Sequence, residues 1–327
     1  MSGRFGFILR RLCFYVLAAW VALTLNFVVP RLMPGDPASN LFAKFQGNLK
    51  PEAMEALKET FGFTDAPLWK QYIDYLSHAM YGDFGISVSY YPTPASEIIW
   101  TGMGWTLLLL GTSVCLSFII GTLLGAWAAW RRGTWVDNLL PPLLSFIGSF
   151  PYFWLALLGL WLFGFMLDWL PVRHAYGRGV TPGFNLPFIS SVALHALMPS
   201  LTLVIVSTGG WLLTMRNTMI AALGEDYIHY AQARGLSEPR VFFNYAVRNS
   251  ILPSLTSFGL ALGFVLSGAL LTEIVFSYPG QGFLLLEAVQ TQDYPLLQGL
   301  FLTITVAVLF ANWLVDILVA IMDPRTA

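Results

Sequence analysis

Long stretches of apolar residues without charge alternate with short charged segments along this chain. A helix needs roughly 20 apolar residues to cross a bilayer core of about 30 Å. Six stretches approach or exceed that length, at residues 12–30, 98–130, 138–167, 179–215, 249–272 and 294–315. The fourth is too long for one helix and is interrupted by Thr181-Pro182-Gly183, so we place its membrane part at about 195–215. The pattern predicts an all-α membrane protein with six transmembrane helices.

The arginines indicate how these helices are oriented, because cytoplasmic segments carry an excess of basic residues. Arg173 and Arg178 lie in a short segment on one side, and Arg31 and all four lysines belong to a long loop, which counts little. The other side holds Arg4, Arg10, Arg11, Arg131, Arg132, Arg216, Arg234, Arg240, Arg248 and Arg325. We therefore expect both termini in the cytoplasm and the first loop outside.

The spans divide the chain into four predicted parts. The first helix is too long for a secretory signal core and is interpreted as an uncleaved anchor. The parts are an N-terminal transmembrane helix at 1–32, an extracytoplasmic loop module at 33–97, a core of five helices at 98–322 with an inner loop at 221–249, and a cytoplasmic tail at 323–327.

The outer loop is expected to hold two short helices. Met54, Leu57 and Phe61 recur at helical spacing, and residues 67–81 are predicted as a second helix. The segment Tyr81-Gly-Asp-Phe-Gly is expected to turn the chain, and Tyr90-Tyr-Pro-Thr-Pro is expected to run extended to the second span. The loop could cap the bundle or dock a partner protein, and the residues leave both open.

The inner loop predicts a helix, a glycine joint and a second helix. Residues 225–234 begin with acids and end at Arg234, and Gly235 follows where helices favour a left-handed residue. Ser237-Glu-Pro is expected to start the next helix, and Pro253 to open the fifth span. On the first helix we expect one shared face that contacts a partner, made of Tyr227, Tyr230, Ala231 and Arg234.

Composition narrows the function classes. Hydrophobic residues make up 56% and charged residues 11% of the 327 residues, against about 25% charged in soluble domains. A net charge of −1 offers nothing to attract nucleic acid. The chain has no G-x-x-x-x-G-K-[ST], no H-E-x-x-H and no C-x-x-C, so we expect no catalytic residue, no metal site and no bound cofactor.

Small residues and prolines mark points of helix contact and bending. Gly121-x-x-x-Gly125 and Gly259-x-x-x-Gly263 would let helix backbones approach closely. Pro141, Pro142 and Pro151 are expected to break or kink the third span.

The inner loop also carries a family resemblance. Asp226-Tyr-Ile-x-x-Ala-x-Ala-Arg-Gly-Leu, then Arg248-Asn249 and Ile251-Leu-Pro253, resembles the coupling loop of binding-protein-dependent ABC importers, in the B-type permease of the dipeptide, oligopeptide and nickel branch. Tyr245 stands where the family usually has His, and Arg234 where it often has Lys. His229 replaces the Glu that names the motif, as is usual in this branch. The other matching motifs, which cover nearly the whole chain, are Met33-Pro-Gly-Asp-Pro37, Gly82-Asp-Phe-Gly-Ile-Ser87, Glu273-Ile-Val-Phe-Ser-Tyr-Pro-Gly280, Asp293-Tyr-Pro295 and Asp323-Pro-Arg325.

The resemblance implies a type I importer permease in a bacterial or archaeal cytoplasmic membrane, surrounded by lipid. It implies a second, C-type permease, two ATPase subunits that hold ATP and Mg²⁺, and an extracytoplasmic substrate-binding protein. The implied ATPase-coupling residues are Asp226, Tyr227, Tyr230, Ala231, Ala233, Arg234, Gly235, Arg248, Asn249 and Pro253. The length of the outer loop and its amphipathic spacing lead us to expect docking residues for the binding protein at Met54, Leu57, Phe61, Asp83 and Phe84.

The cargo and the mode of energy supply have alternatives. Peptide is the first expectation, and an oligosaccharide or a nickel chelate would use the same machine. An ion-coupled carrier acting alone would need ionisable groups near the membrane midplane and inverted repeats, and neither is found.

Overall fold

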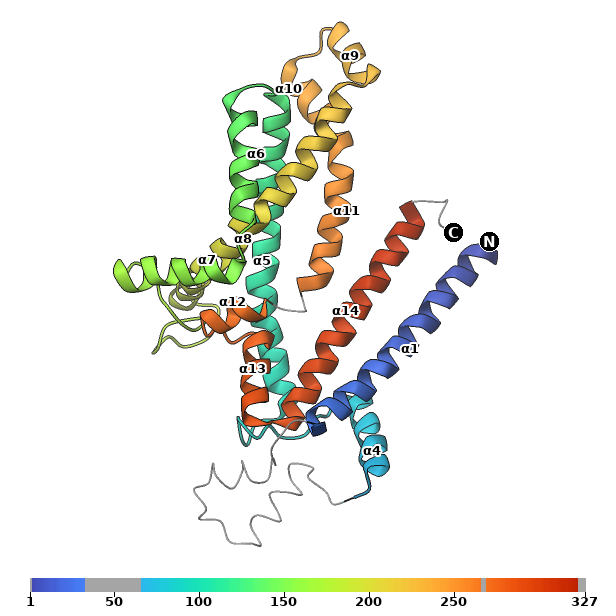
Figure 1. The fold of residues 1–327 in the computed structure, drawn as a ribbon, viewed down its shortest axis with the longest axis vertical. Helices are drawn as coiled ribbons and strands as arrows, with labels where there is room; N and C mark the ends of the chain where they lie inside the picture. The colour runs from blue at the N-terminus through green and yellow to red at the C-terminus, as the bar shows by residue number, and fades with distance from the viewer. Residues whose placement is uncertain (1, 33–65, 266–268, 323–327) are drawn as a thin grey trace. The chain divides into compact units, whose positions relative to one another are not determined.

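The computed structural model describes residues 2–32, 66–265 and 269–322, and in these ranges the regular structure is helical apart from one isolated bridge between Ile86 and Pro94 (Figure 1). Four helices are long and apolar enough to cross a membrane, and a bent helix pair is a fifth candidate. The predicted all-helical membrane class is therefore confirmed, with four to five candidate spans among the described residues.

The chain divides into two compact units. The first comprises residues 1–106, 266–270 and 279–327, and the second comprises 107–265 and 271–278. The helix α5 (Ala95–Trp130) begins in the first unit and continues into the second.

In the first unit, α1 packs against α14, and α4 contacts α1. An apolar cluster joins the start of α5 to α13 and α14 through Ala95, Ile99, Leu284, Ala288, Leu296, Leu297 and Leu300. Gly299 permits this packing, because a Cβ there would lie 3.0 Å from the Phe84 ring and collide with Ile99. The other helices of this unit are α1 (Ser2–Leu32), α4 (Leu68–Tyr81), α13 (Gln281–Thr291) and α14 (Tyr294–Met322).

The second unit is built around the helix α8, which contacts α6, α7 and α11. The predicted break at residues 181–183 is confirmed, since α8 begins at Leu186 and the Asn185 side chain accepts a hydrogen bond from Phe188 N at 2.8 Å. The helices are α6 (Trp135–Gly148), α7 (Tyr152–Gly159), α8 (Leu186–Leu223), α9 (Asp226–Ala233), α10 (Glu238–Arg240), α11 (Arg248–Phe264) and α12 (Leu270–Val275), with π-helical turns η1 (Leu160–Met166) and η2 (Val241–Val247).

The two predicted glycine pairs differ in how closely a neighbouring helix approaches them. A Cβ at Gly121 would lie 2.7 Å from the Thr208 carbonyl oxygen, and one at Gly125 would collide with the Leu212 carbonyl oxygen. The close approach of α5 to α8 is therefore confirmed. At Gly259 the space around a Cβ is open, so the expected close approach at that residue is wrong.

The third apolar stretch bends sharply. Helix α6 and the continuous α7–η1 segment meet at 91°, and Pro151 caps the start of α7. The expected break is thus confirmed at Pro151. Pro141 and Pro142 lie inside α6 without ending it, so they do not break the helix.

Two further local predictions are wrong. Residues 90–93 form a turn closed by a hydrogen bond from Thr93 N to Tyr90 O at 2.9 Å, whereas an extended course was expected. Pro253 lies inside α11 and does not open it, because the helical course runs without a break from Glu238 to Phe264.

Candidate functional site

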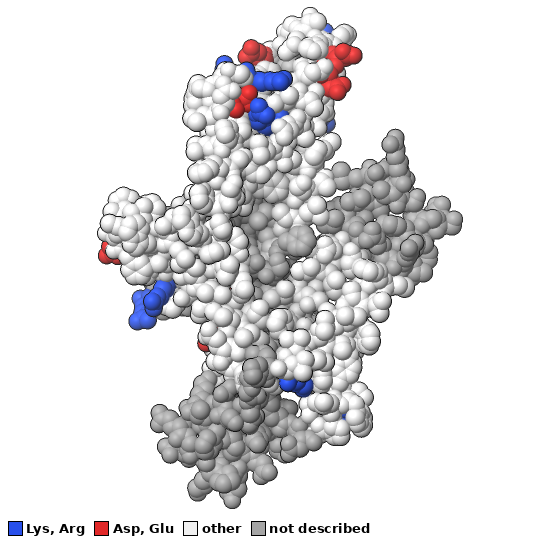
Figure 2. Space-filling model, in the orientation of Figure 1, with Lys and Arg blue, Asp and Glu red and all other residues white. Residues whose placement is uncertain are grey.

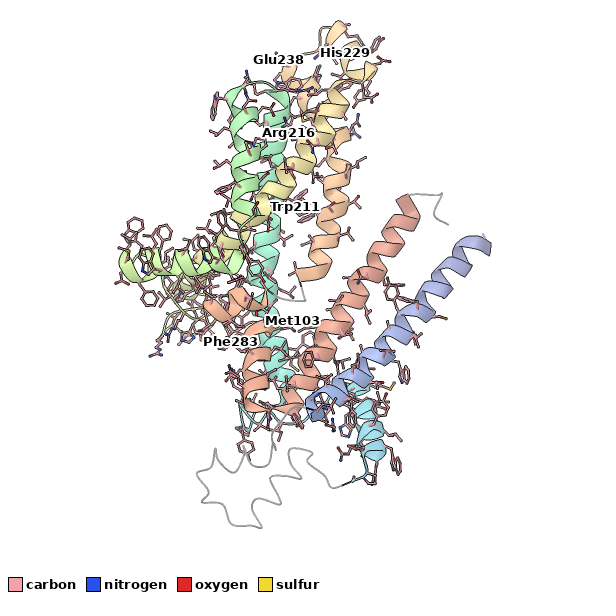
Figure 3. The ribbon with its side chains drawn as sticks, in the orientation of Figure 1. Met103, Trp211, Arg216, His229, Glu238 and Phe283 are labelled. Carbon is pink, nitrogen blue, oxygen red and sulfur yellow. The ribbon has the colours of Figure 1, made fainter. Side chains whose placement is uncertain are left out.

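The candidate coupling site is the end of the second unit that α9 and α10 form. Figure 2 shows blue and red side chains gathered at this end, next to an uncharged surface along the same unit. In Figure 3, His229 on α9 and Glu238 on α10 lie at the tip, and Arg216 lies further along α8. Charged groups at one end of an apolar bundle are typical of a membrane–water boundary.

An apolar cluster fastens α9 to the bundle. Its buried members come from α5, α8, α9 and the segment that follows α10, and α9 supplies Ile228 and Ala231. The buried residues are Ala126, Ala129, Met215, Met219, Ile228, Ala231, Val241 and Ala246. The close packing of this cluster holds α9 against α5 and α8.

The C-terminus of α9 ends as the sequence predicts. Gly235 has a φ of +75°, and its N–H donates to the Gln232 carbonyl at 2.9 Å. Leu236 N donates to the Ala231 carbonyl at 3.4 Å, and the Leu236 side chain packs on the apolar cluster. These two bonds form a Schellman motif, which needs a left-handed residue at the position of Gly235.

The exposed face of α9 differs from the predicted one. Tyr230 is 66% exposed, and the Arg234 guanidinium lies 5.8 Å from the centroid of its ring. Ala231 is only 2% exposed and packs inward with Ile228. The prediction that Ala231 shares the exposed face of Tyr230 is therefore wrong, and Tyr227 lies between the two sides, half-buried against the cluster.

The remaining predicted coupling residues lie at the surface of this unit. Asp226 and Ala233 are exposed on α9, and Gly235 is exposed in the joint. Arg248, Asn249 and Pro253 are also exposed, but they lie on α11 and belong to the helix that leads away from the joint.

An ion pair that sequence reasoning missed supports this end of the unit. Arg216 on α8 donates from Nε to Asp137 Oδ1 on α6 at 2.6 Å, and Asp137 is buried. Gly133 N donates to the other oxygen at 3.0 Å. A buried carboxylate with a charged partner and a backbone donor holds two helices in one arrangement. The sequence shows only a single acid, Asp137, next to an apolar stretch, and it does not indicate which residue pairs with that acid.

The predicted docking residues differ in where they lie in the structure. Met54, Leu57 and Phe61 lie outside the described residues. Asp83 is exposed, with its carboxylate 3.6 Å from His78 and accepting from Gly85 N at 3.0 Å. Phe84 packs against the apolar cluster of the first unit, so its side chain points into its own unit.

Two motifs that are distant in sequence meet in the first unit. Asp293 is fully buried, and its Oδ2 accepts from Ser87 Oγ at 2.5 Å and from Ser89 N at 2.9 Å. Its Oδ1 accepts from Leu296 N at 3.1 Å, which caps the start of α14. We call this set of contacts the Asp293 latch.

Tyr90 adds a second fastening beside the Asp293 latch. Its hydroxyl donates to the Glu287 carboxylate on α13. Burial, and then this hydrogen bond, raise the pKa of the Tyr90 hydroxyl. The segment 87–90 is thus tied to both α13 and α14.

In the described ranges no group of three or more His, Cys, Asp or Glu side chains is placed to hold a metal ion. The α9–α10 end presents an exposed surface with charged side chains, and residues 87–90 are held by polar contacts to Asp293 and Glu287.

Comparison with known proteins defines the class. The family model described as "Binding-protein-dependent transport system inner membrane component" matches residues 121–327. The chain belongs to this family, so it is a multi-pass transport component of the inner membrane and not a catalytic subunit.

Individual relatives match the chain almost from end to end. It is 33% identical over 337 residues to the dipeptide transport system permease protein DppB of Escherichia coli, covering 98% of each chain. It is 32% identical over 338 residues to the di/tripeptide transport system permease protein DppB of Pseudomonas aeruginosa, and 31% identical over 340 residues to DppB of Alkalihalophilus pseudofirmus, again with 98% coverage of each chain.

Proposed function

We propose that this chain is the permease subunit of an ATP-driven importer of short peptides. It forms half of the translocation pathway, and a second, homologous C-type permease forms the other half. Two ATPase subunits bind ATP and Mg²⁺, and an extracytoplasmic binding protein delivers the cargo. The peptide cargo is supported by the names of three near full-length relatives, two for dipeptides and one for di- and tripeptides.

The proposed topology has six spans, with both termini in the cytoplasm and the insertion 33–97 outside. The ten arginines of the inner segments support the orientation. Two of the six proposed spans are not single long helices among the described residues. Helix α11 has only 17 residues, and the third span is the bent pair of α6 and α7–η1.

The α9 surface is the proposed contact with an ATPase subunit. The observation that carries this proposal is the combination of an exposed outer face with a deeply buried inner one. Tyr230 and Arg234 face outward, and Ile228 and Ala231 are embedded in the cluster that includes α5 and α8. Closure of the ATPases would therefore move α9 together with the bundle, as a rigid element between two states.

Reconstitution into liposomes tests the proposed function. Uptake of a labelled dipeptide should require this chain, the C-type permease, both ATPases, the loaded binding protein and internal ATP. Leaving out any one component should reduce uptake to the level of empty liposomes. Dipeptide uptake by this chain alone, driven by an ion gradient, would overturn the proposal.

Cargo is tested in the same liposomes. A nickel chelate or an oligosaccharide offered with the same binding protein should not be accumulated. Accumulation of either one without dipeptide uptake would keep the machine and change the cargo.

A further inference from the structure

Helix α4 is attached to α1 by one of its faces. The Tyr72 hydroxyl lies 2.7 Å from Thr24 Oγ1, and Arg31 donates to Gln71 Oε1 at 3.2 Å. The Phe27 ring contacts the rings of Tyr72 and Tyr75 at centroid distances of 5.2 and 5.7 Å. These contacts fix the height of α4 along α1.

That height is the end of a candidate membrane span. The span of α1 covers Cys13–Arg31, and the residues that contact α4 lie in its last two turns. At 1.5 Å per residue they fall within about 10 Å of the end of the span. A helix attached there lies where the lipid headgroups meet the acyl chains.

A second face of α4 is an exposed apolar stripe made of Trp69, Ile73, Leu76 and Met80. With 3.6 residues per turn these positions fall within an arc of about 60°. Trp69 is 66%, Ile73 56% and Met80 87% exposed, and Leu76 is half-buried. No described side chain covers the stripe, although large apolar groups in a row are rarely left in water.

The third face is polar and is centred about 120° around the helix from the stripe. It is made of Lys70, Asp74, Ser77 and His78, all of which are exposed. Helices with one apolar side that carries Trp, and one charged side, lie in the membrane interface with the apolar side toward the acyl chains.

We propose that α4 is an interfacial helix whose apolar stripe is buried in the lipid leaflet at the C-terminal end of α1. Its polar face then points to water and is the side that a soluble binding protein meets. The inference rests on the proposal that α1 crosses the membrane, and it is independent of the cargo and of the contact at α9.

Depth measurement with spin labels tests this directly. Single cysteines replace Trp69, Ile73 or Met80 on the stripe, and Lys70, Asp74 or Ser77 on the polar face, after Cys13→Ser and Cys115→Ser. Each labelled chain is assembled with its permease and ATPase partners in phosphatidylethanolamine–phosphatidylglycerol vesicles. Collision rates with oxygen, which concentrates in lipid, and with a water-soluble nickel chelate are then compared.

The stripe positions should show an oxygen-to-nickel ratio several times that of the polar positions, in a helical period. Equal access of the nickel chelate to both sets would overturn the proposal. Exclusion of both reagents from the stripe would show a protein cover instead of lipid. Protection that arises only after the loaded binding protein is added would make the stripe its docking site.

A spin label at Leu17, which is exposed on α1, distinguishes failure of the interfacial-helix proposal from failure of the proposed α1 span. If this label contacts lipid while the stripe positions are accessible to the nickel chelate, only the interfacial-helix proposal is refuted. A wet label at Leu17 would refute the span on which the inference rests.

Discussion

The α9 end of the second unit and residues 87–90 of the first unit are held in place by opposite kinds of contact. The helix α9 is held by apolar packing of Ile228 and Ala231, while residues 87–90 are held by hydrogen bonds to Asp293 and Glu287. Apolar packing of small residues tolerates no change of volume, whereas a hydrogen-bonded latch depends on particular donors and acceptors. The first arrangement suits transmission of force, and the second suits holding a loop in place.

The largest effect is expected from overfilling the inner cluster. Ala231→Trp adds an indole to a closely packed site, and we expect uptake to fall to background. Thermal unfolding of the purified complex should occur at lower temperature, since overpacking typically costs about 1–3 kcal/mol or more.

The matched control is Ala233→Trp, the same change at an exposed position of the same helix. It should lower the unfolding temperature much less than Ala231→Trp does, since it adds no volume to the core. Equal unfolding temperatures for both variants would contradict the assignment of Ala231 to the core.

A comparable loss of uptake is expected from Gly235→Val. A β-branched residue is strained at a φ of +75°, so the Schellman motif at the end of α9 should be lost. Uptake should fall to background while the chain remains in the membrane. Gly224→Val serves as the control, because Gly224 has a φ of −84°; similar behaviour of the two variants would mean that the left-handed joint is not required.

The next largest effect is expected from breaking the Asp137–Arg216 ion pair. Asp137→Asn leaves Arg216 without its charged partner, and breaking a buried pair of this kind costs about 3 kcal/mol. Thermal unfolding of the assembled complex is the measurement, with the exposed Asp226→Asn as control. An unchanged unfolding temperature for Asp137→Asn would show that the pair does not hold α6 to α8.

The Asp293 latch should give the smallest of these effects. Asp293→Asn keeps one acceptor oxygen, so it weakens the bonds to Ser87, Ser89 and Leu296 without removing all of them, and the loss should be about 1–2 kcal/mol. We expect faster proteolysis of the 82–94 segment and a modest loss of stability. Asp83→Asn, on the exposed turn of the same segment, should be cleaved at the same rate as the native chain. Equal proteolysis of the two variants would show that the Asp293 latch does not hold this segment in place.

The sequence predicts the helices well, because charge-free stretches and helix-ending residues are local signals. The break at 181–183 before α8, the turn at Gly235 and the break at Pro151 each depend on neighbours along the chain. The turn at 90–93 was not foreseen, since proline is compatible with both a turn and an extended chain.

The inward face of α9 could not be chosen from spacing alone. Tyr230 and Arg234 share a helical face by spacing, but so do Ile228 and Ala231, and burial decides between them only in three dimensions. The Asp137–Arg216 pair joins residues 79 positions apart, and no local pattern links them. The family was nevertheless predictable from the sequence, since its motifs are short runs of neighbouring residues.

The central claim, that α9 is the contact with an ATPase subunit, is tested most directly by cross-linking in the assembled transporter. A single cysteine replaces Tyr230 in a chain carrying Cys13→Ser and Cys115→Ser, and a Ser77→Cys chain serves as the control. The cysteine carries a short photoactivatable reagent attached through a disulfide, and the claim predicts a cross-link between position 230 and an ATPase subunit, with uptake blocked while the link holds and restored by reduction, and no link at position 77. Absence of any link at position 230 in a complex that transports at the native rate would contradict it.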